Sequence, residues 1–258
     1  MIKDKIIGRP TRLNRQVLVP NGEYAEVVFL GDVHYGSPQC DVPRFLSMLD
    51  YCLQNKIYVF LMGDMIEMAT RDSVGAGIYE QEEKAEDQFG EMIGFLKPLA
   101  EAKLILGFLS GNHEERVYKS VGIDIGKAMA RELKIPYLGH ACWSQFSVGT
   151  QKYSVYALHG TTASRFDGTV LKAVENVSYS FSADLVAMGH AHRAVNGFLV
   201  VESVVDNKVV EKKKFIVVTG SYVKYHDSYY EKSGGQISKL GSPKVKLFAA
   251  KHDISISW

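Results

Sequence analysis

The strongest constraint on the fold is a set of short apolar runs, each ending at polar residues. The first three runs, Ala25–Leu30, Ile57–Met62 and Leu104–Leu109, show little alternation, which is typical of strands buried on both faces. Between them, apolar residues recur at helical spacing from Pro43 to Gln54 and from about Glu80 to Pro98. This alternation of strand and helix predicts βαβ units around a parallel sheet, and therefore an α/β protein.

The pattern changes at Trp143, after which most segments are strand-like. One helix is predicted around Thr169–Tyr179, and turn residues such as Asp206 and Asn207 separate the strands. The sequence contains no internal repeat and no Pro/Ser-rich linker. We therefore predict a single domain with two packed sheets over residues 23–258, in which 196–258 is a β-rich, Lys/Tyr-rich C-terminal part. Residues 1–22 are basic and are predicted to be an N-terminal arm or a peripheral strand.

The bulk composition is that of an ordinary globular protein. A chain of 258 residues with 46% hydrophobic residues can bury a large core, and a net charge of +1 does not by itself call for a polyanionic partner. The three cysteines are isolated, so reduced thiols are expected rather than disulfides. We find no secretory leader and no apolar run of membrane-spanning length, and we expect a cytoplasmic protein without a membrane partner.

Residues that commonly bind metals follow the ends of the apolar runs. Five of the eight histidines fall in these clusters. The clusters are Asp32-Val33-His34, Gly63-Asp64, Gly111-Asn112-His113-Glu114, His159-Gly160 and Gly189-His190-Ala191-His192. Because ligands bind outside the carboxyl ends of strands in α/β sheets, this distribution indicates one shared site.

The chemistry of these residues favours a dinuclear metal centre. Such a centre holds two divalent ions about 3.5–4 Å apart and needs a carboxylate that can bridge them. Asp32 and His34 are two residues apart, as are His190 and His192, so on an extended strand each pair would point the same way. Oxygen and nitrogen ligands favour Mn²⁺, with Fe, Zn²⁺ or Ni²⁺ as alternatives.

The order Asp-x-His, Gly-Asp, Gly-Asn-His-Glu, His, Gly-His-x-His resembles that of the calcineurin-like metallophosphoesterase superfamily over residues 25–195. The resemblance implies a four-layer α/β/β/α sandwich, with two mixed sheets flanked by helices and meeting at the metal site. It also implies a phosphoesterase in which metal-activated water attacks phosphorus. The implied metal ligands are Asp32, His34, Asp64, Asn112, His159, His190 and His192, with Asp64 bridging the two ions.

Two further residues match catalytic positions of that superfamily. His113 matches the histidine that contacts the phosphate and protonates the leaving oxygen. Glu67 matches the acidic residue that orients this histidine, with a surface carboxylate as the alternative interpretation. Glu114 fits a structural role as well as a functional one.

The substrate class follows less directly from the motifs. Protein Ser/Thr phosphatases of the superfamily carry an arginine soon after Gly-Asp, whereas this chain reads Gly63-Asp64-Met65-Ile66-Glu67-Met68. The motifs look more like those of the SbcD-type nuclease and phosphodiesterase branches. We therefore expect hydrolysis of phosphodiesters in DNA, RNA or a nucleotide derivative. The alternatives are a phosphomonoesterase acting on small molecules or nucleic-acid ends, and a non-catalytic scaffold.

Several residues beside the motifs are candidates for substrate contact. Tyr35, Arg116 and Arg165 lie close to the predicted ligands in the sequence, although structural salt bridges are an equally simple role for the arginines. The stretch Tyr222–Lys246 interleaves tyrosines with lysines, a pattern that suits base stacking and phosphate binding. An amphipathic loop and edge strand is the alternative for this stretch. The sequence leaves the oligomeric state open.

Overall fold

Two six-stranded mixed sheets form the centre of the computed structural model, which describes residues 13–70, 73, 79, 81–161, 164, 166–232 and 234–258. Sheet A has the order β1 (Leu13–Leu18), β6 (Ala141–Val148), β7 (Gln151–Leu158), β8 (Leu185–Met188), β10 (Lys208–Thr219), β9 (Ala194–Val205). Sheet B has the order β12 (Ile254–Ser257), β11 (Lys244–Phe248), β2 (Tyr24–Leu30), β3 (Tyr58–Leu61), β4 (Ile105–Leu109), β5 (Tyr137–Gly139). Strands β2 to β5 are parallel, as are β7, β8 and β10.

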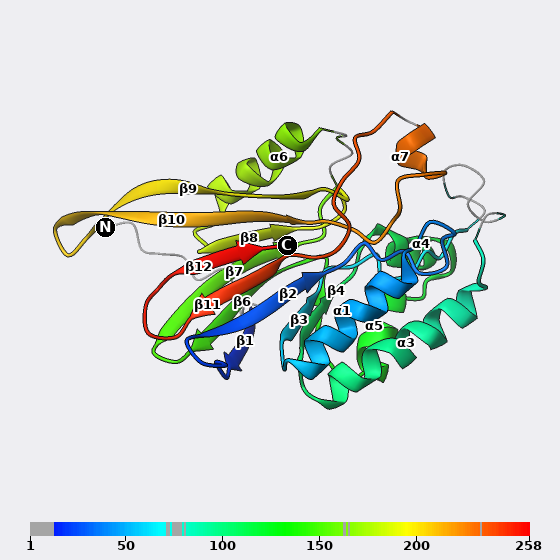
Figure 1. Cartoon of the computed structure of the whole chain (residues 1–258), viewed down its shortest axis with the longest axis horizontal. Helices are drawn as coiled ribbons and strands as arrows, with labels where there is room; N and C mark the ends of the chain where they lie inside the picture. The colour runs from blue at the N-terminus through cyan, green and yellow to red at the C-terminus, as the bar shows by residue number, and fades with distance from the viewer. Residues whose placement is uncertain are drawn as a thin grey trace.

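Helices cover the outer face of each sheet (Figure 1). The helices on the side of sheet B are α1 (Val42–Gln54), α3 (Ala85–Glu101), α4 (Asn112–Val121) and α5 (Ile125–Glu132), whereas α6 (Asp167–Ser180) lies on sheet A. The short α7 (Tyr229–Lys232) belongs to the connection between β10 and β11. The layers therefore follow the order α/β/β/α, which confirms the predicted fold class.

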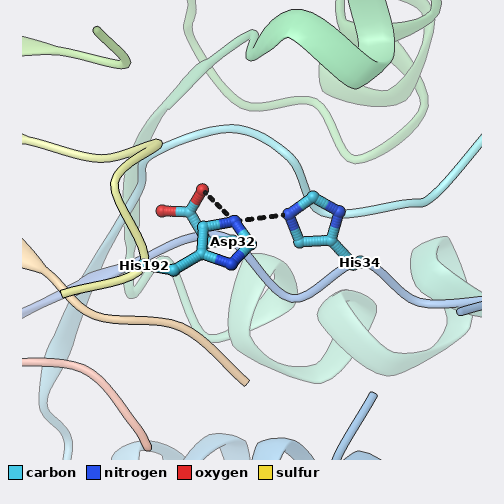
Figure 2. Close-up of side chains that lie close together, drawn as sticks. All are labelled: Asp32, His34 and His192. Carbon is cyan, nitrogen blue, oxygen red and sulfur yellow. Dashed lines mark hydrogen bonds and ion pairs between the residues drawn. The ribbon is translucent and has the colours of Figure 1, made fainter. Parts of the chain in front are cut away.

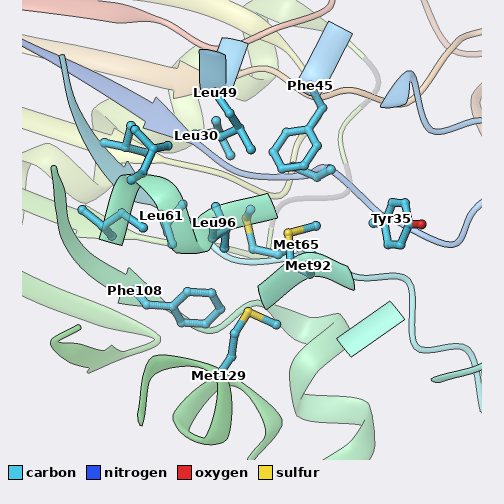
Figure 3. Packing of buried hydrophobic residues seen from close by; sticks show 14 of the residues in the cluster. Leu30, Tyr35, Phe45, Leu49, Leu61, Met65, Met92, Leu96, Phe108 and Met129 are labelled. Atoms are coloured by element: carbon cyan, nitrogen blue, oxygen red, sulfur yellow. The ribbon is translucent and has the colours of Figure 1, made fainter. Parts of the chain in front are cut away.

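Three apolar clusters lie between these four layers. Strand β2 shows why its sequence is a continuous apolar run: Val28 and Leu30 face the helices, Val27 and Phe29 face sheet A, and all four are fully buried. The cluster under the helices brings strand residues together with Phe45 and other helix side chains (Figure 3). The third cluster joins sheet A to α6.

Local differences from the sequence prediction concentrate at the ends of elements. Helix α4 was not predicted. It precedes α5, which corresponds to the helix expected near Ile123–Leu133. Gly122, with φ of 74°, ends α4 in the left-handed conformation. Helix α3 runs to Glu101, with Pro98 in its last turn. Of the predicted N-terminal arm, Leu13–Leu18 form the edge strand β1, and residues 1–12 lie outside the described residues.

The cysteines agree with the expectation of reduced thiols. Cys40, Cys52 and Cys142 are free and buried. Among the helices of the described residues, none combines the length and the apolar character that crossing a membrane requires.

Candidate metal centre

The predicted metal-binding residues gather where the two sheets meet at the carboxyl ends of their parallel strands. In sheet B, the clusters follow β2, β3 and β4, and in sheet A they follow β7 and β8. Contacts between the sheets join the clusters: the backbone N–H of His190 donates to Asp32, and His159 Nδ1 lies 2.9 Å from the carbonyl oxygen of Met62. Residues distant in the sequence are thereby brought to one place.

One group of ligand-competent atoms comprises Asp32, His34 and His192 (Figure 2). The two imidazoles face each other with 2.9 Å between their Nε2 atoms, and His192 Nε2 lies 3.4 Å from an Asp32 carboxylate oxygen. Asp32 is fully buried. Burial opposes its ionisation, but the hydrogen bond and charge of His192 outweigh this and hold the pKa of Asp32 below its ordinary value.

A second group comprises Asp64, His159 and His190, with Asn112 beside them. His159 Nε2 lies 3.2 Å from Asp64 Oδ2. The Asn112 side-chain oxygen lies 3.1 Å from His159 Nε2 and 2.7 Å from His190 Nδ1. Two imidazole nitrogens and an amide oxygen thus converge on the same carboxylate.

Asp64 lies between the two groups. Its Oδ2 atom faces His159 at 3.2 Å and His34, a member of the first group, at 3.8 Å, while its Oδ1 accepts from the backbone N–H of His113. Burial opposes the charge, yet the surrounding histidines, His159 first among them, hold the pKa of Asp64 well below its usual range. In return Asp64 overcomes the effect of burial on His159 and raises the pKa of that imidazole to about 10.

The donor set fits divalent metal ions. Carboxylate and imidazole ligand atoms converge in three overlapping groups, the third of which joins His34 and Asp64 to His113. The far ring nitrogens of two histidines are fixed by oxygen acceptors. His159 Nδ1 faces the carbonyl of Met62, and His34 Nδ1 lies 2.9 Å from Glu67 Oε2. An acceptor at Nδ1 places the proton there and leaves Nε2 free to bind a cation, as in protein metal sites.

The backbone at the predicted ligands is not extended. Asp32, His34, Asp64, His190 and His192 all have φ between 50° and 67°, in the left-handed region. Residues other than glycine adopt this conformation rarely, and it costs on the order of 1–3 kcal/mol each. The prediction that the residues of each pair, Asp32/His34 and His190/His192, lie on an extended strand was therefore wrong. They are presented by tight turns that follow the strands, and His190 and His192 belong to different ligand groups.

His113 lies at the edge of this centre, at the start of α4. Its Nδ1 is 2.7 Å from the carbonyl oxygen of Glu67, so that nitrogen donates and Nε2 is directed to Asp64 Oδ2 at 3.9 Å. Burial, together with the nearby charges of His34 and Arg116, lowers the pKa of His113 to about 4 against the opposing charge of Asp64.

The carboxylate of Glu67 has a different principal partner from the one the motif suggested. It lies 2.9 Å from His34 Nδ1 and 3.4 Å from His113 Nδ1, with an Arg116 nitrogen at 3.6 Å. Burial raises the pKa of Glu67, but the hydrogen bond and charge of His34 more than compensate and lower it to about 2. Glu67 therefore supports a predicted metal ligand as well as His113.

The candidate substrate contacts separate into three cases. Arg116 lies 3.0 Å from His113 Nδ1, at the rim of the centre. Tyr35 does not face the centre: its side chain is packed in the core on the α3 side, edge-on to Phe95, with its hydroxyl on Glu91 (Figure 3). Its backbone pairs with Ile66 in an isolated parallel bridge, and its ring belongs to the apolar cluster under the helices. Arg165 lies outside the described residues.

No protein-family model and no curated protein matches the sequence. Solved structures with a similar fold include Yfce, a phosphoesterase from E. coli, at 15% identity over 90% of this chain and 98% of that chain (TM-score 0.41). Also similar is a metallophosphoesterase from Sphaerobacter thermophilus, at 12% identity over 90% of this chain and 86% of that chain (TM-score 0.41). So is Vps29 complexed with Zn²⁺ from Entamoeba histolytica, at 12% identity over 90% of this chain and 97% of that chain (TM-score 0.38). All three identities are 15% or lower.

Glu114 has a role that the motif did not specify. It is buried beneath the centre, and its two carboxylate oxygens accept from the backbone N–H groups of Asp64, Met65 and Gly111. Burial and the charge of Asp64 raise the pKa of Glu114, whereas the hydrogen bonds from the backbone of Gly111 and Met65 act to lower it. Glu114 is three residues after the N-cap Gly111 and accepts from its backbone N–H, which is the glutamate half of a capping box and could have predicted the start of α4.

We expect Gly111→Ala to disrupt the centre. A Cβ atom at this position would lie 2.1 Å from Asp64 Oδ1 and 2.6 Å from Asp64 N, so the Asp64 carboxylate would have to move. We expect loss of bound metal, measured by elemental analysis, and a stability loss of about 1–3 kcal/mol in urea unfolding.

Gly90→Ala is the matched control for this substitution. Gly90 lies within α3, and a Cβ there would meet no atom within 4 Å. We expect unchanged metal content and a gain of about 0.5–1 kcal/mol, because alanine is the better helix former. Equal metal binding by the two variants would show that close approach at Gly111 does not position Asp64.

Proposed function

We propose that this chain is a metal-dependent phosphoesterase of the calcineurin-like type, with two divalent ions at the candidate centre. The observation that carries the proposal is Asp64, a buried carboxylate that lies between two groups of imidazole and carboxylate ligands. Mn²⁺ is the proposed ion, with Fe, Zn²⁺ or Ni²⁺ as alternatives. In such a centre the ions supply an activated water and neutralise charge on the phosphoryl oxygens.

The residues of the chain have distinct proposed tasks. Asp32, His34 and His192 would hold one ion, and Asn112, His159 and His190 the other, with Asp64 shared. Met62 and Glu67 would keep the imidazoles of His159 and His34 oriented. The turns after β2, β3 and β8 would pre-organise these ligands, so that little reorganisation accompanies binding.

His113 is the proposed general acid for the leaving group. Its Nδ1 is held by the Glu67 carbonyl and its Nε2 is directed to the centre, where an imidazolium could protonate a leaving oxygen. The anionic charge of a bound phosphoester favours the protonated imidazole, which offsets the lowering of the His113 pKa by burial.

We expect His113→Ala to reduce kcat by about 10²-fold or more, with the metal content of the wild type retained. His252→Ala is the control, because His252 is exposed and its Nε2 contacts the Lys152 carbonyl away from the centre. Elemental analysis and steady-state kinetics are the measurements. If His113→Ala loses one equivalent of metal, His113 is a ligand and not an acid.

Phosphodiesters are the proposed substrates. The support is the chain's own sequence after Gly63-Asp64, which lacks the arginine of protein Ser/Thr phosphatases. A phosphomonoesterase with the same centre is the second candidate. The presence of every ligand and of His113 disfavours a non-catalytic scaffold.

The deciding experiment compares turnover of bis-p-nitrophenyl phosphate with that of p-nitrophenyl phosphate, with and without Mn²⁺, followed by labelled DNA and RNA. We expect Mn²⁺-dependent turnover with preference for the diester, abolished by chelator. Strong preference for the monoester would overturn the diesterase proposal. Absence of hydrolysis with each metal would overturn the enzyme proposal itself.

A further inference from the structure

A cavity of about 560 Å³ opens beside His192, at the edge of the candidate centre. The connection between β10 and β11, which includes α7, forms most of its wall and lies at the same end of the molecule as α4 (Figure 1). Pro38 and Gln39, just after the first ligand cluster, also line it. A volume of this size is within the range of about 300–1,000 Å³ that small-molecule sites occupy.

The wall formed by residues 221–240 is tied in place. Ser221 bridges to Leu240 at the base of the segment, and the backbone N–H of Lys224 donates to the carbonyl of Gln39 at 2.8 Å. The buried Arg193 is paired with Asp167 and also donates to the carbonyl of Gln236. Connections of this length are most often functional when they are ordered.

Tyr225 is the lining residue best suited to recognise a ligand. Its hydroxyl donates to the Gly235 carbonyl at 3.0 Å, which fixes the ring in the wall, and the side chain is half-buried. A fixed aromatic ring offers a face on which a planar base can stack. Tyr222, the first tyrosine of the stretch Tyr222–Lys246, is instead fully buried in the core.

The rest of the lining combines apolar and polar groups. Pro38, Val223 and Leu240 supply apolar surface, whereas Gln39 and Lys224 supply an amide and a cation. The lining also includes Asp227 and His226, whose ring packs edge-on to Tyr225. Apolar surface suits a base better than a bare sugar phosphate, and the amide and cation suit the polar edge of a base and an anionic ester. A lipid chain would leave these polar groups unpaired.

We propose that this cavity binds the nucleoside part of the substrate, with its base against Tyr225, while the phosphoester lies at the metal centre. This rests on the proposed phosphoesterase function and deepens it by assigning the substrate class, a nucleotide ester rather than a sugar or lipid phosphate. His192 joins the two parts, because it lines the cavity and belongs to the first ligand group.

The test begins with binding, which does not depend on turnover. Calorimetric titration of the full chain with adenosine 5′-monophosphate, in the presence of chelator, is compared with titration by ribose 5-phosphate and by inorganic phosphate. We expect the wild type to bind the nucleotide more tightly than either control, and Tyr225→Ala to weaken that binding by about tenfold or more. Equal binding of nucleotide and ribose 5-phosphate would overturn the assignment of a base site.

A second variant distinguishes stacking on the Tyr225 ring from the hydrogen bond that ties Tyr225 to Gly235. Tyr225→Phe keeps the ring but loses the hydrogen bond to Gly235, and we expect it to bind nearly as well as the wild type. If it weakens nucleotide binding as much as Tyr225→Ala, the ring is not a stacking surface and the proposal fails. Tyr179→Ala is the matched control, because Tyr179 is an exposed tyrosine on α6.

Turnover provides an independent second measurement. With Mn²⁺, the ratio of kcat/KM for thymidine 5′-(p-nitrophenyl phosphate) to that for bis-p-nitrophenyl phosphate should fall about tenfold in Tyr225→Ala. An unchanged ratio would contradict the base site. Nucleotide binding without hydrolysis of either ester would refute the phosphoesterase function and leave the cavity assignment standing, so the two failures are distinguishable.

Discussion

Asp64→Asn is expected to reduce metal-dependent turnover by about 10³-fold or more, the largest effect of any single change proposed. Its Oδ2 atom faces ligands from both groups, and an amide cannot bind two cations because its NH₂ group carries no available lone pair. The side-chain oxygen can still accept from the backbone of His113, so the shape of the site should be kept. Several kcal/mol of transition-state stabilisation depend on the ions, which corresponds to the expected rate loss.

The measurements for this variant are kcat/KM with saturating Mn²⁺ and metal stoichiometry by elemental analysis. We expect the stoichiometry to fall to one ion or fewer. Asp50→Asn, an exposed position on α1, is the control and should match the wild type in both. Two tightly bound ions and normal turnover in Asp64→Asn would show that the carboxylate does not bridge.

The periodicities of the sequence predicted an α/β protein and polar clusters at one edge of a sheet, whereas the four-layer sandwich and the ligand set were implied by the family resemblance. Continuous apolar runs such as Val27–Leu30 occur where a strand is buried on both faces, and parallel strands bring their carboxyl ends to one edge. The polar residues that follow these runs had to meet. That inference needed no knowledge of how the intervening turns were built.

The turns themselves could not be predicted. Nothing in Asp32-Val33-His34 distinguishes an extended segment from the left-handed turns that the chain adopts, with φ of 50° at Asp32 and 53° at His34. Tyr35, the next residue, packs in the core rather than toward the candidate centre. Long-range packing selects the left-handed turns, since Asp32 and His34 donate their N–H groups to the carbonyls of Gly63 and Asp64. Pairings that connect different loops are not encoded in local spacing.

The different roles of Glu67 and Glu114 could not be predicted from the sequence either. Both follow predicted ligands in the sequence, yet Glu67 contacts imidazole nitrogens, whereas Glu114 accepts hydrogen bonds from backbone N–H groups. These contacts join the loops that follow β3 and β4, which are far apart in the sequence. Hydrogen bonds of this kind hold the left-handed turn at Asp64 in place.

Glu114→Gln is expected to destabilise the fold by about 3–5 kcal/mol. Glu114 Oε2 accepts from Asp64 and Gly111, and Oε1 accepts from Met65, at 2.8–2.9 Å. A glutamine can offer an oxygen to one side only, and its NH₂ group would then face a backbone donor in a buried site. Because these N–H groups belong to the turns that present Asp64, metal affinity should fall together with stability. Urea unfolding of the metal-free protein measures the first effect, and metal titration the second.

Glu115→Gln tests whether the effect is specific to the buried carboxylate. Glu115 is the next residue on α4, with its side chain 37% exposed and paired with Lys119 one turn later. Losing such a surface pair costs no more than about 0.5 kcal/mol. If both variants unfold at the same urea concentration, the strained ligand turns do not depend on Glu114, and the packing of β3 against β4 must hold them unaided.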